Sequence, residues 1–156
     1  QILNFMILDE HGEKSSRIDR TKPFQLVAEY VVRKKSKELD LNFSITTASN
    51  ENGVSSNTSV FQWSNRHYRR YKFNDENISL EPGNFRVTAK FPGYILNSGK
   101  YNFFAHLTYA ESVFYQFNKQ PILFELFDLG SSHTSKRGGR SSGLIAMPLE
   151  WDTQTL

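Results

Sequence analysis

The sequence predicts an all-β domain built as an antiparallel β-sandwich. Three observations predict it. Apolar and polar residues alternate along most of the chain, with almost no helical period. Turn residues interrupt this alternation at short intervals, without helices between the apolar stretches. The chain of 156 residues holds 13 Phe, 7 Tyr and 2 Trp, and such an aromatic share favours strands and aromatic-lined surfaces.

About ten segments have the character of strands. In order, they are Ile2–Asp9, Phe24–Arg33, Leu39–Ala48, Val54–Trp63, Ile78–Leu80, Phe85–Phe91, Tyr101–Tyr109, Val113–Phe117, Ile122–Asp128 and a short piece near Leu149–Trp151. Within Leu39–Ala48 the alternation is regular, since Leu41, Phe43 and Ile45 share one face and Asn42, Ser44 and Thr46 the other. The segment Phe85–Phe91 alternates in the same way, with Arg86 and Lys90 on its polar face.

Turn sequences stand where these strands must reverse. Asp9–Gly12 and Asn50–Gly53 each end in a glycine, which adopts positive φ without strain. Glu81–Gly83 and Asn97–Gly99 punctuate the next two strands. Short strands at this spacing, with no helices between them, predict an antiparallel sandwich.

Two stretches do not fit a strand. Ser64–Lys72 is polar, basic and aromatic, and Gly130–Gly143 is rich in Gly, Ser and Arg, which predicts a flexible loop. Apolar character returns at Leu144–Trp151. We therefore expect a single domain over 1–156, whose last strand, near 144–151, packs on its own domain or is exchanged between the subunits of a dimer.

Composition excludes several classes of function. The chain has no cysteine, so disulfides, thiol nucleophiles and cysteine-based metal centres are ruled out. It has no phosphate loop and no nucleophile elbow. Its four histidines lack the spacing of metal ligands, and the net charge of +3 is not gathered in one long block. We expect no metal, no cofactor and no nucleic-acid partner. No apolar run reaches membrane-spanning length.

A candidate binding face lies on the hairpin formed by Tyr101–Tyr109 and Val113–Phe117. A three-residue connection pairs Tyr109 with Val113, Leu107 with Tyr115 and Ala105 with Phe117 on the core face. The opposite face then carries Phe104, His106, Thr108, Phe114 and Gln116, with His106 across from Gln116. An aromatic ring beside amide, hydroxyl and imidazole groups suits a carbohydrate ligand.

The candidate carbohydrate-binding residues are Phe104, His106, Gln116, Asn42, Ser44, Arg86, Trp63 and Tyr68. Asn42 and Ser44 extend the polar face, Arg86 could meet an anionic substituent, and Trp63 and Tyr68 could form a rim. Each has an ordinary structural alternative: an aromatic that covers the core or a subunit surface, a hydrogen-bonded histidine, or solvated polar residues on any sandwich. No catalytic residue is assigned.

The order of motifs carries a family resemblance. Leu80-Glu81-Pro82-Gly83-Asn84-Phe85 precedes Phe91-Pro92 and Leu96-Asn97-Ser98-Gly99-Lys100-Tyr101, and Arg140-Ser141-Ser142-Gly143-Leu144 precedes Leu149-Glu150-Trp151. This order resembles the C-terminal carbohydrate-binding domain of Wzt, the nucleotide-binding subunit of bacterial O-antigen polysaccharide ABC exporters.

The resemblance implies an immunoglobulin-like or jelly-roll sandwich of about eight to ten strands, in some members dimeric by exchange of the C-terminal strand. It implies a cytoplasmic, non-catalytic domain at the inner-membrane face. Such a domain binds lipid-linked O-antigen polysaccharide, often at its non-reducing end, and so selects it for export through a membrane-spanning exporter subunit. The ATPase half would lie upstream of Gln1. The resemblance assigns no binding residue.

Two other functions stay open. The same aromatics could be buried at a protein interface, which would make the chain a structural or interaction sandwich. A sugar-active enzyme would need a close pair of carboxylates beside the groove.

Overall fold

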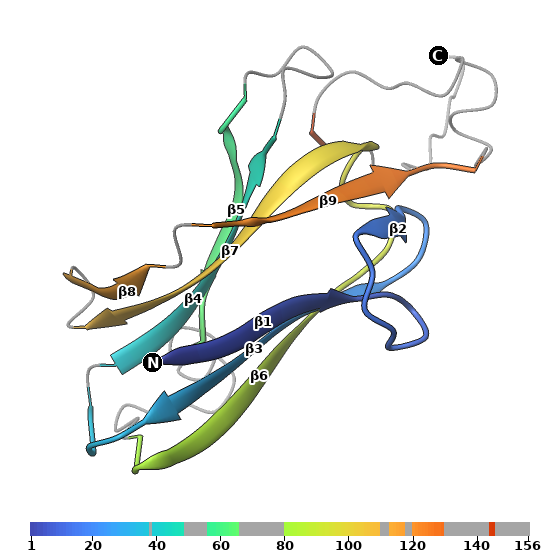
Figure 1. Ribbon diagram of the computed structural model, residues 1–156. Coiled ribbons are helices and arrows are strands. Elements are labelled where there is room, and N and C mark those ends of the chain that lie inside the picture. Colours follow the sequence, from blue (N-terminus) through green and yellow to red (C-terminus); the bar gives the residue numbers. More distant parts are fainter. Residues whose placement is uncertain are drawn as a thin grey trace, which may run out of the picture.

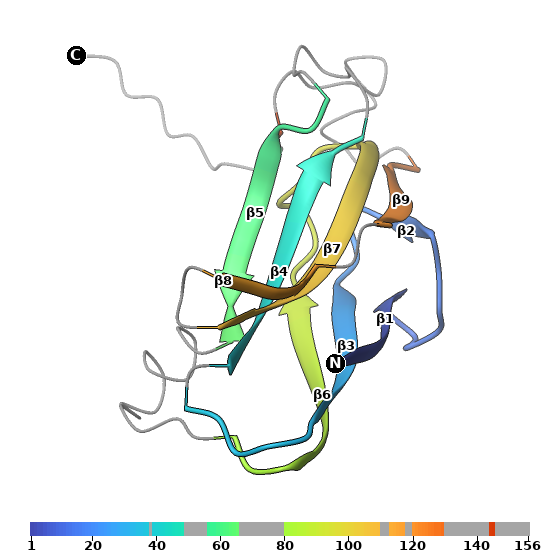
Figure 2. The same cartoon turned by 60° about the vertical axis from the view of Figure 1, so that its left-hand side comes forward.

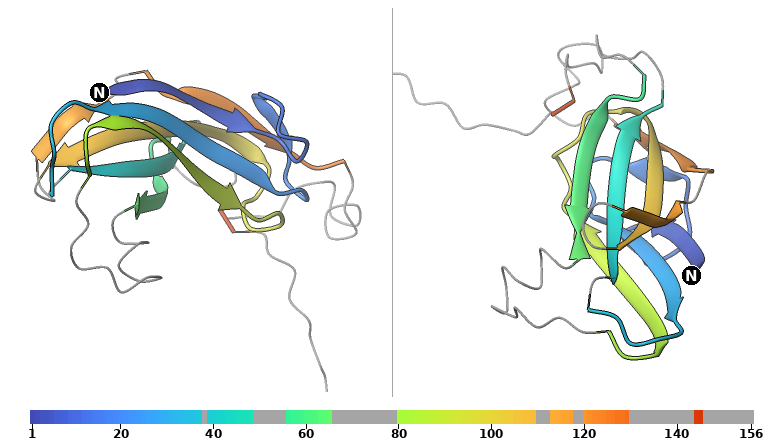
Figure 3. Two further views of the ribbon diagram at one scale, coloured as in Figure 1. Left: turned by 90° about the horizontal axis from the view of Figure 1, so that it is seen from below. Right: turned by 90° about the vertical axis from the view of Figure 1, so that its left-hand side faces the viewer.

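The computed structural model describes residues 1–37, 39–48, 56–65, 80–109, 120–129 and 144–145, and the backbone of 113–117. The predicted all-β sandwich is confirmed: two sheets are stacked as layers (Figures 1 and 3). The smaller sheet has the order β1-β3-β6, and the larger has the order β2-β9-β7-β4-β5, with β8 paired to β7.

The strand bounds agree with the alternation pattern at most positions. The strands are β1 (Ile2–Leu8), β2 (Arg17–Asp19), β3 (Phe24–Val32), β4 (Leu39–Thr47), β5 (Ser59–Ser64), β6 (Gly83–Phe91), β7 (Gly99–Tyr109), β8 (Val113–Phe117) and β9 (Ile122–Phe127). The expected start of β5 at Val54 is wrong in part, because residues 56–58 precede the strand. The expected strand near Leu149–Trp151 and the turn Asn50–Gly53 lie outside the described residues.

Strand β2 is missing from the sequence prediction. It has three residues, of which only Ile18 is buried, and it pairs in parallel with β9. The segment before it joins the two sheets, because Ser15 N donates to Ile7 O at 3.1 Å and Glu125 N donates to Ser16 O at 2.8 Å. A strand this short, with one apolar residue, leaves no periodic signal in the sequence.

The core lies between the inner faces of the two sheets and is largely aromatic. Phe24 of β3 stacks on Phe91 of β6, with ring centroids 4.9 Å apart. Across the sandwich Phe103 of β7 meets Phe5 of β1 edge to face, and Phe61 of β5 meets Phe91 in the same way. Edge-to-face and offset contacts are the favoured aromatic geometries, and they add to the free energy gained by burying the rings.

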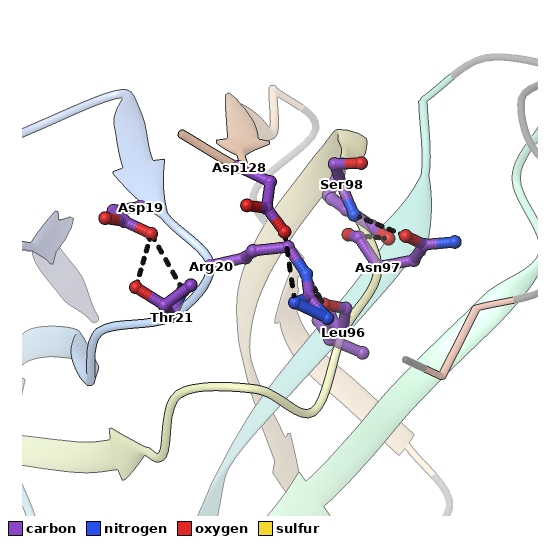
Figure 4. A network of polar contacts seen from close by, with 8 residues as sticks. Asp19, Arg20, Thr21, Leu96, Asn97, Ser98 and Asp128 are labelled. Carbon is purple, nitrogen blue, oxygen red and sulfur yellow. Dashed lines mark hydrogen bonds and ion pairs between the residues drawn. The ribbon is translucent and has the colours of Figure 1, made fainter. Parts of the chain in front are cut away.

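A buried polar network ties three loops together at one end of the sandwich (Figure 4). The Arg20 guanidinium forms an ion pair with Asp128 at 3.4 Å, and its Nε donates to Leu96 O at 3.2 Å. The side chains of Arg20 and Asp128 are 1% and 3% exposed. Tyr94 N donates to Arg20 O at 2.7 Å, and the Tyr94 ring lies 5.8 Å from the guanidinium carbon.

The described part of the late apolar segment packs against this network. Ile145 forms an antiparallel bridge with Leu96, and Asn97 N donates to Leu144 O at 2.9 Å. Asn97 is fully buried. The network therefore fixes the edge on which residues 144–145 lie.

Candidate functional site

The outer face of the larger sheet carries polar side chains, which alternate along each strand with side chains that point into the core. Leu41, Phe43 and Ile45 of β4 are buried in the core, as predicted. The intervening residues therefore point away from the core. Register pairs Asn42 with His106 and Ser44 with Phe104 on β7. The structure thus brings four of the eight predicted binding residues, Asn42, Ser44, Phe104 and His106, onto one face.

One half of this face is buried, although its residues are polar. Asp40, Asn42, Ser64 and His106 are each less than a tenth exposed. Ser64 Oγ donates to Asp40 Oδ2, and Asn42 Nδ2 donates to Thr108 Oγ1 at 2.9 Å. The backbone of β8 passes across the outer side of β4 here (Figure 2). A polar cluster of this kind is rigid when its hydrogen bonds are made, so it suits a supporting role.

The pKa of His106 is lowered from its ordinary value. Burial is the larger cause, because it disfavours the charged imidazolium, and the nearby Asp40 carboxylate opposes it in part. His106 is therefore a neutral imidazole near pH 7. At 4% exposure it is placed to position its neighbours rather than to meet a ligand directly.

This lowered pKa predicts a loss of stability in mild acid. The unfolded chain takes up a proton near pH 6.5, whereas the folded chain resists it. The free energy of unfolding should fall as pH decreases below about 6.5, until the pKa of the folded state is reached. His106→Gln should flatten this fall. Urea unfolding of both proteins between pH 8 and pH 5 measures it, and equal slopes would contradict the assignment.

The other half of the outer face is accessible. Ser44, Asn102 and Phe104 are half-buried, and Gln62 is exposed. Register places Gln62 beside Ser44, and Ser44 beside Phe104. Leu123 of β9, paired with Asn102, is 55% exposed. The accessible strip, defined as Gln62, Ser44, Phe104, Asn102 and Leu123, thus offers one ring and one aliphatic side chain beside a hydroxyl and two amides.

The structure separates Arg86 and Trp63 from this strip. Arg86 lies on β6 of the smaller sheet, opposite Glu29, and forms an ion pair with it at 3.5 Å. Trp63 pairs with Phe43, whose side chain lies in the core. Paired residues share a face, so Trp63 belongs to the inner side of edge strand β5, where it is 50% exposed. Tyr68 lies outside the described residues.

The predicted register of the β7–β8 hairpin is correct at Tyr109, which pairs with Val113, and at Thr108, which pairs with Phe114, and it is wrong beyond Thr108. Leu107 pairs with Gln116, not Tyr115, and His106 pairs with Phe117, not Gln116. An irregularity after Thr108 places one extra residue in β8. Because such a bulge shifts every later residue by one position, the expected pairing of Ala105 with Phe117 is lost as well.

Sequence reasoning missed several members of this face. Asp40 was overlooked although it continues the alternation of Asn42 and Ser44 toward the start of β4. Gln62 and Ser64 join the face only through the register of β5 with β4. Asn102 continues the alternation of Phe104 and His106 along β7, and Leu123 joins the face through the register of β9 with β7. Alternation could have identified Asp40 and Asn102, whereas Gln62, Ser64 and Leu123 need the strand order.

The described residues hold neither a metal-binding cluster nor a membrane-spanning helix. No group of three or more histidine or acidic side chains there is arranged to hold a metal ion. In the same part of the chain, no helix has the length and apolar character that crossing a membrane requires.

The fold and its polar sheet face define the chain as a two-sheet β-sandwich domain. It is similar to the solved structure of the C-terminal domain of Wzt, with a TM-score of 0.70 and 12% identity, over 99% of this chain and 83% of that chain. This likeness shows a shared fold. Chicken MD-1 complexed with lipid IVa aligns at 15% identity, over 79% of this chain and 75% of that chain. Its TM-score of 0.33 is too low to indicate a common fold. No family model and no curated protein matches the sequence.

Proposed function

We propose that this chain is a non-catalytic carbohydrate-recognition domain. Its ligand is the lipid-linked O-antigen polysaccharide, bound at its non-reducing terminus and thereby selected for export by an ABC transporter. The observation that carries the proposal is the accessible strip on a sandwich that shares the fold of the Wzt C-terminal domain. The order of turn motifs along the sequence supports the same assignment.

In this proposal the two halves of the outer face have different tasks. A sugar ring packs its C–H face on Phe104, while Ser44, Gln62 and Asn102 exchange hydrogen bonds with its hydroxyls. Asn42 and His106 are buried, so in this proposal they do not contact the sugar and instead hold the strands of the accessible strip in place. A single domain makes few contacts with the ligand, so its affinity is weak. Pairing of two domains raises the overall affinity.

The cellular setting is part of the proposal. We place the domain in the cytoplasm, at the inner-membrane face, as a homodimer attached through its parent subunit to the membrane-spanning exporter. The strand near 144–151 is exchanged in that dimer. In the exchanged dimer, Ile145 of one copy would form with Leu96 of the other copy the bridge that the two residues form within one chain here. Light scattering at micromolar concentration should give twice the chain mass.

Calorimetric titration tests the function. The chain should bind the O-polysaccharide of its own source strain and no unrelated glycan, and the recovered polymer should have its original length. Absence of binding to the native polymer would refute the proposal. Shortened or modified polymer would point to a sugar-active enzyme instead. A structure in which a partner protein covers the accessible strip would favour an interaction sandwich.

A further inference from the structure

The connection between β3 and β4 is strongly basic. Arg33, Lys34, Lys35 and Lys37 lie within five positions, and all four are exposed. With Glu38, which follows them in the sequence, the formal charge of this segment equals the +3 of the whole chain. It is the densest run of basic residues in the described part of the chain.

Residues 33–37 of this basic connection have a defined structure. Ser36 and Leu80 form a two-hydrogen-bond bridge, with N–O distances of 3.0 and 2.8 Å. Ser36 Oγ also accepts a hydrogen bond from Leu39 N at 3.1 Å. Since Leu80 is buried, the centre of the connection is anchored to the core. The basic side chains on either side of Ser36 are thus displayed from a fixed backbone.

Among the described residues, acidic neighbours neutralise little of this charge. Lys35 pairs with Glu81. Arg33 donates to the neutral amide oxygen of Gln1 at 3.3 Å and keeps its charge. Within the described residues, no acid pairs with Lys34 or Lys37. The connection therefore presents a net positive surface to solvent.

Two large apolar side chains are exposed at the same end of the sandwich. Leu3, near the start of β1, is 56% exposed, and Tyr109, at the end of β7 and paired with Leu39, is 45% exposed. Figures 1 and 2 both place the start of β1, the β3–β4 connection and the end of β7 at one end. Basic side chains flanked by leucine and tyrosine are the combination that binds the interface of an anionic bilayer.

We propose that this end of the domain docks on an anionic lipid bilayer. Lys34 and Lys37 meet the lipid phosphates, and Leu3 and Tyr109 enter the headgroup layer. The exposed apolar pair favours a bilayer over a soluble acidic polymer, because a polymer of that kind offers no apolar phase to receive it. The surface is distinct from the accessible strip, so its test is independent of carbohydrate binding.

Co-sedimentation with vesicles tests the proposal. The chain should sediment with vesicles of phosphatidylcholine and phosphatidylglycerol in equal parts, and not with phosphatidylcholine alone. Roughly 1 M salt, where the Debye length is about 3 Å, should release it. The double variant Lys34→Glu/Lys37→Glu should weaken binding at least about tenfold, given the known contribution of each basic residue near such a surface.

The matched control changes the same charge at the other end of the sandwich. Lys14 and Lys22 are exposed and flank β2, so Lys14→Glu/Lys22→Glu alters net charge equally. It should keep binding within about twofold of the unchanged chain. Equal losses in the two double variants would overturn the proposal, because net charge alone would then explain the binding. Failure to sediment with anionic vesicles, or binding to heparin without binding to vesicles, would overturn it too.

Discussion

Replacing Arg20 with methionine should cost about 3–5 kcal/mol of the free energy of unfolding. The substitution leaves the Asp128 carboxylate, whose side chain is 3% exposed, without its cation. It also removes the donor to Leu96 O and so loosens the edge that holds residues 144–145. A domain of this size has only about 5–15 kcal/mol in total, so the variant should approach the limit of folding. Urea unfolding midpoints at pH 7 measure the change.

Arg17 provides the matched control for this prediction. It forms an ion pair with Glu125 at 3.2 Å, but both side chains are substantially exposed, at 69% and 41%. Solvent screens such a pair, so Arg17→Met should cost under about 1 kcal/mol. The double variant Arg20→Met/Asp128→Leu removes both buried charges and should recover most of the loss. Similar midpoints for Arg20→Met and Arg17→Met would contradict the role given to the network.

Local patterns predicted the strands well because burial alternates with the backbone. Phe43 and Ile45 are buried while Ser44 between them is not, and this follows directly from a pleated strand. Gly12 has φ of 80°, as the predicted turn Asp9–Gly12 requires. Such features depend on residues that are close in the sequence, so local sequence patterns predict them.

Features that depend on pairing between distant strands could not be predicted. The bulge in β8 shifts Gln116 away from His106, and no local pattern marks it. Arg86 and Ser44 alternate in the same manner, yet the strand order places them on different sheets. His106 is buried, and it lies between β4 and β8, two strands that are distant from each other in the sequence. These are long-range properties, and the candidate site was therefore predicted only in part.

Removal of the Phe104 ring should weaken carbohydrate binding by at least about 30-fold, the loss expected for an aromatic anchor worth about 2 kcal/mol. In the proposal Phe104 is the ring of the accessible strip on which a sugar stacks. Stacking on the ring orients the sugar, so that its hydroxyls can form hydrogen bonds with the neighbouring Ser44 and Asn102. Phe104→Ala should therefore reduce affinity far more than Ser44→Ala. Unfolding midpoints should show that the variant remains folded.

Trp63 is the control that separates the two sides of the sheet. It is more exposed than Phe104, but register places it on the inner side of β5, opposite Phe43. If exposed aromatics bound sugar wherever they lie, Trp63→Ala would be the more damaging change. If the accessible strip is the site, Trp63→Ala should leave affinity within about twofold.

The central claim is that the outer face of the larger sheet binds carbohydrate. Calorimetric titration tests it most directly, with the native O-polysaccharide added to the unchanged chain, to Phe104→Ala and to Trp63→Ala. The claim predicts binding by the unchanged chain and by Trp63→Ala, and a loss of at least about 30-fold for Phe104→Ala. Unchanged affinity in Phe104→Ala together with a loss in Trp63→Ala would contradict it and move the site to the inner edge of β5.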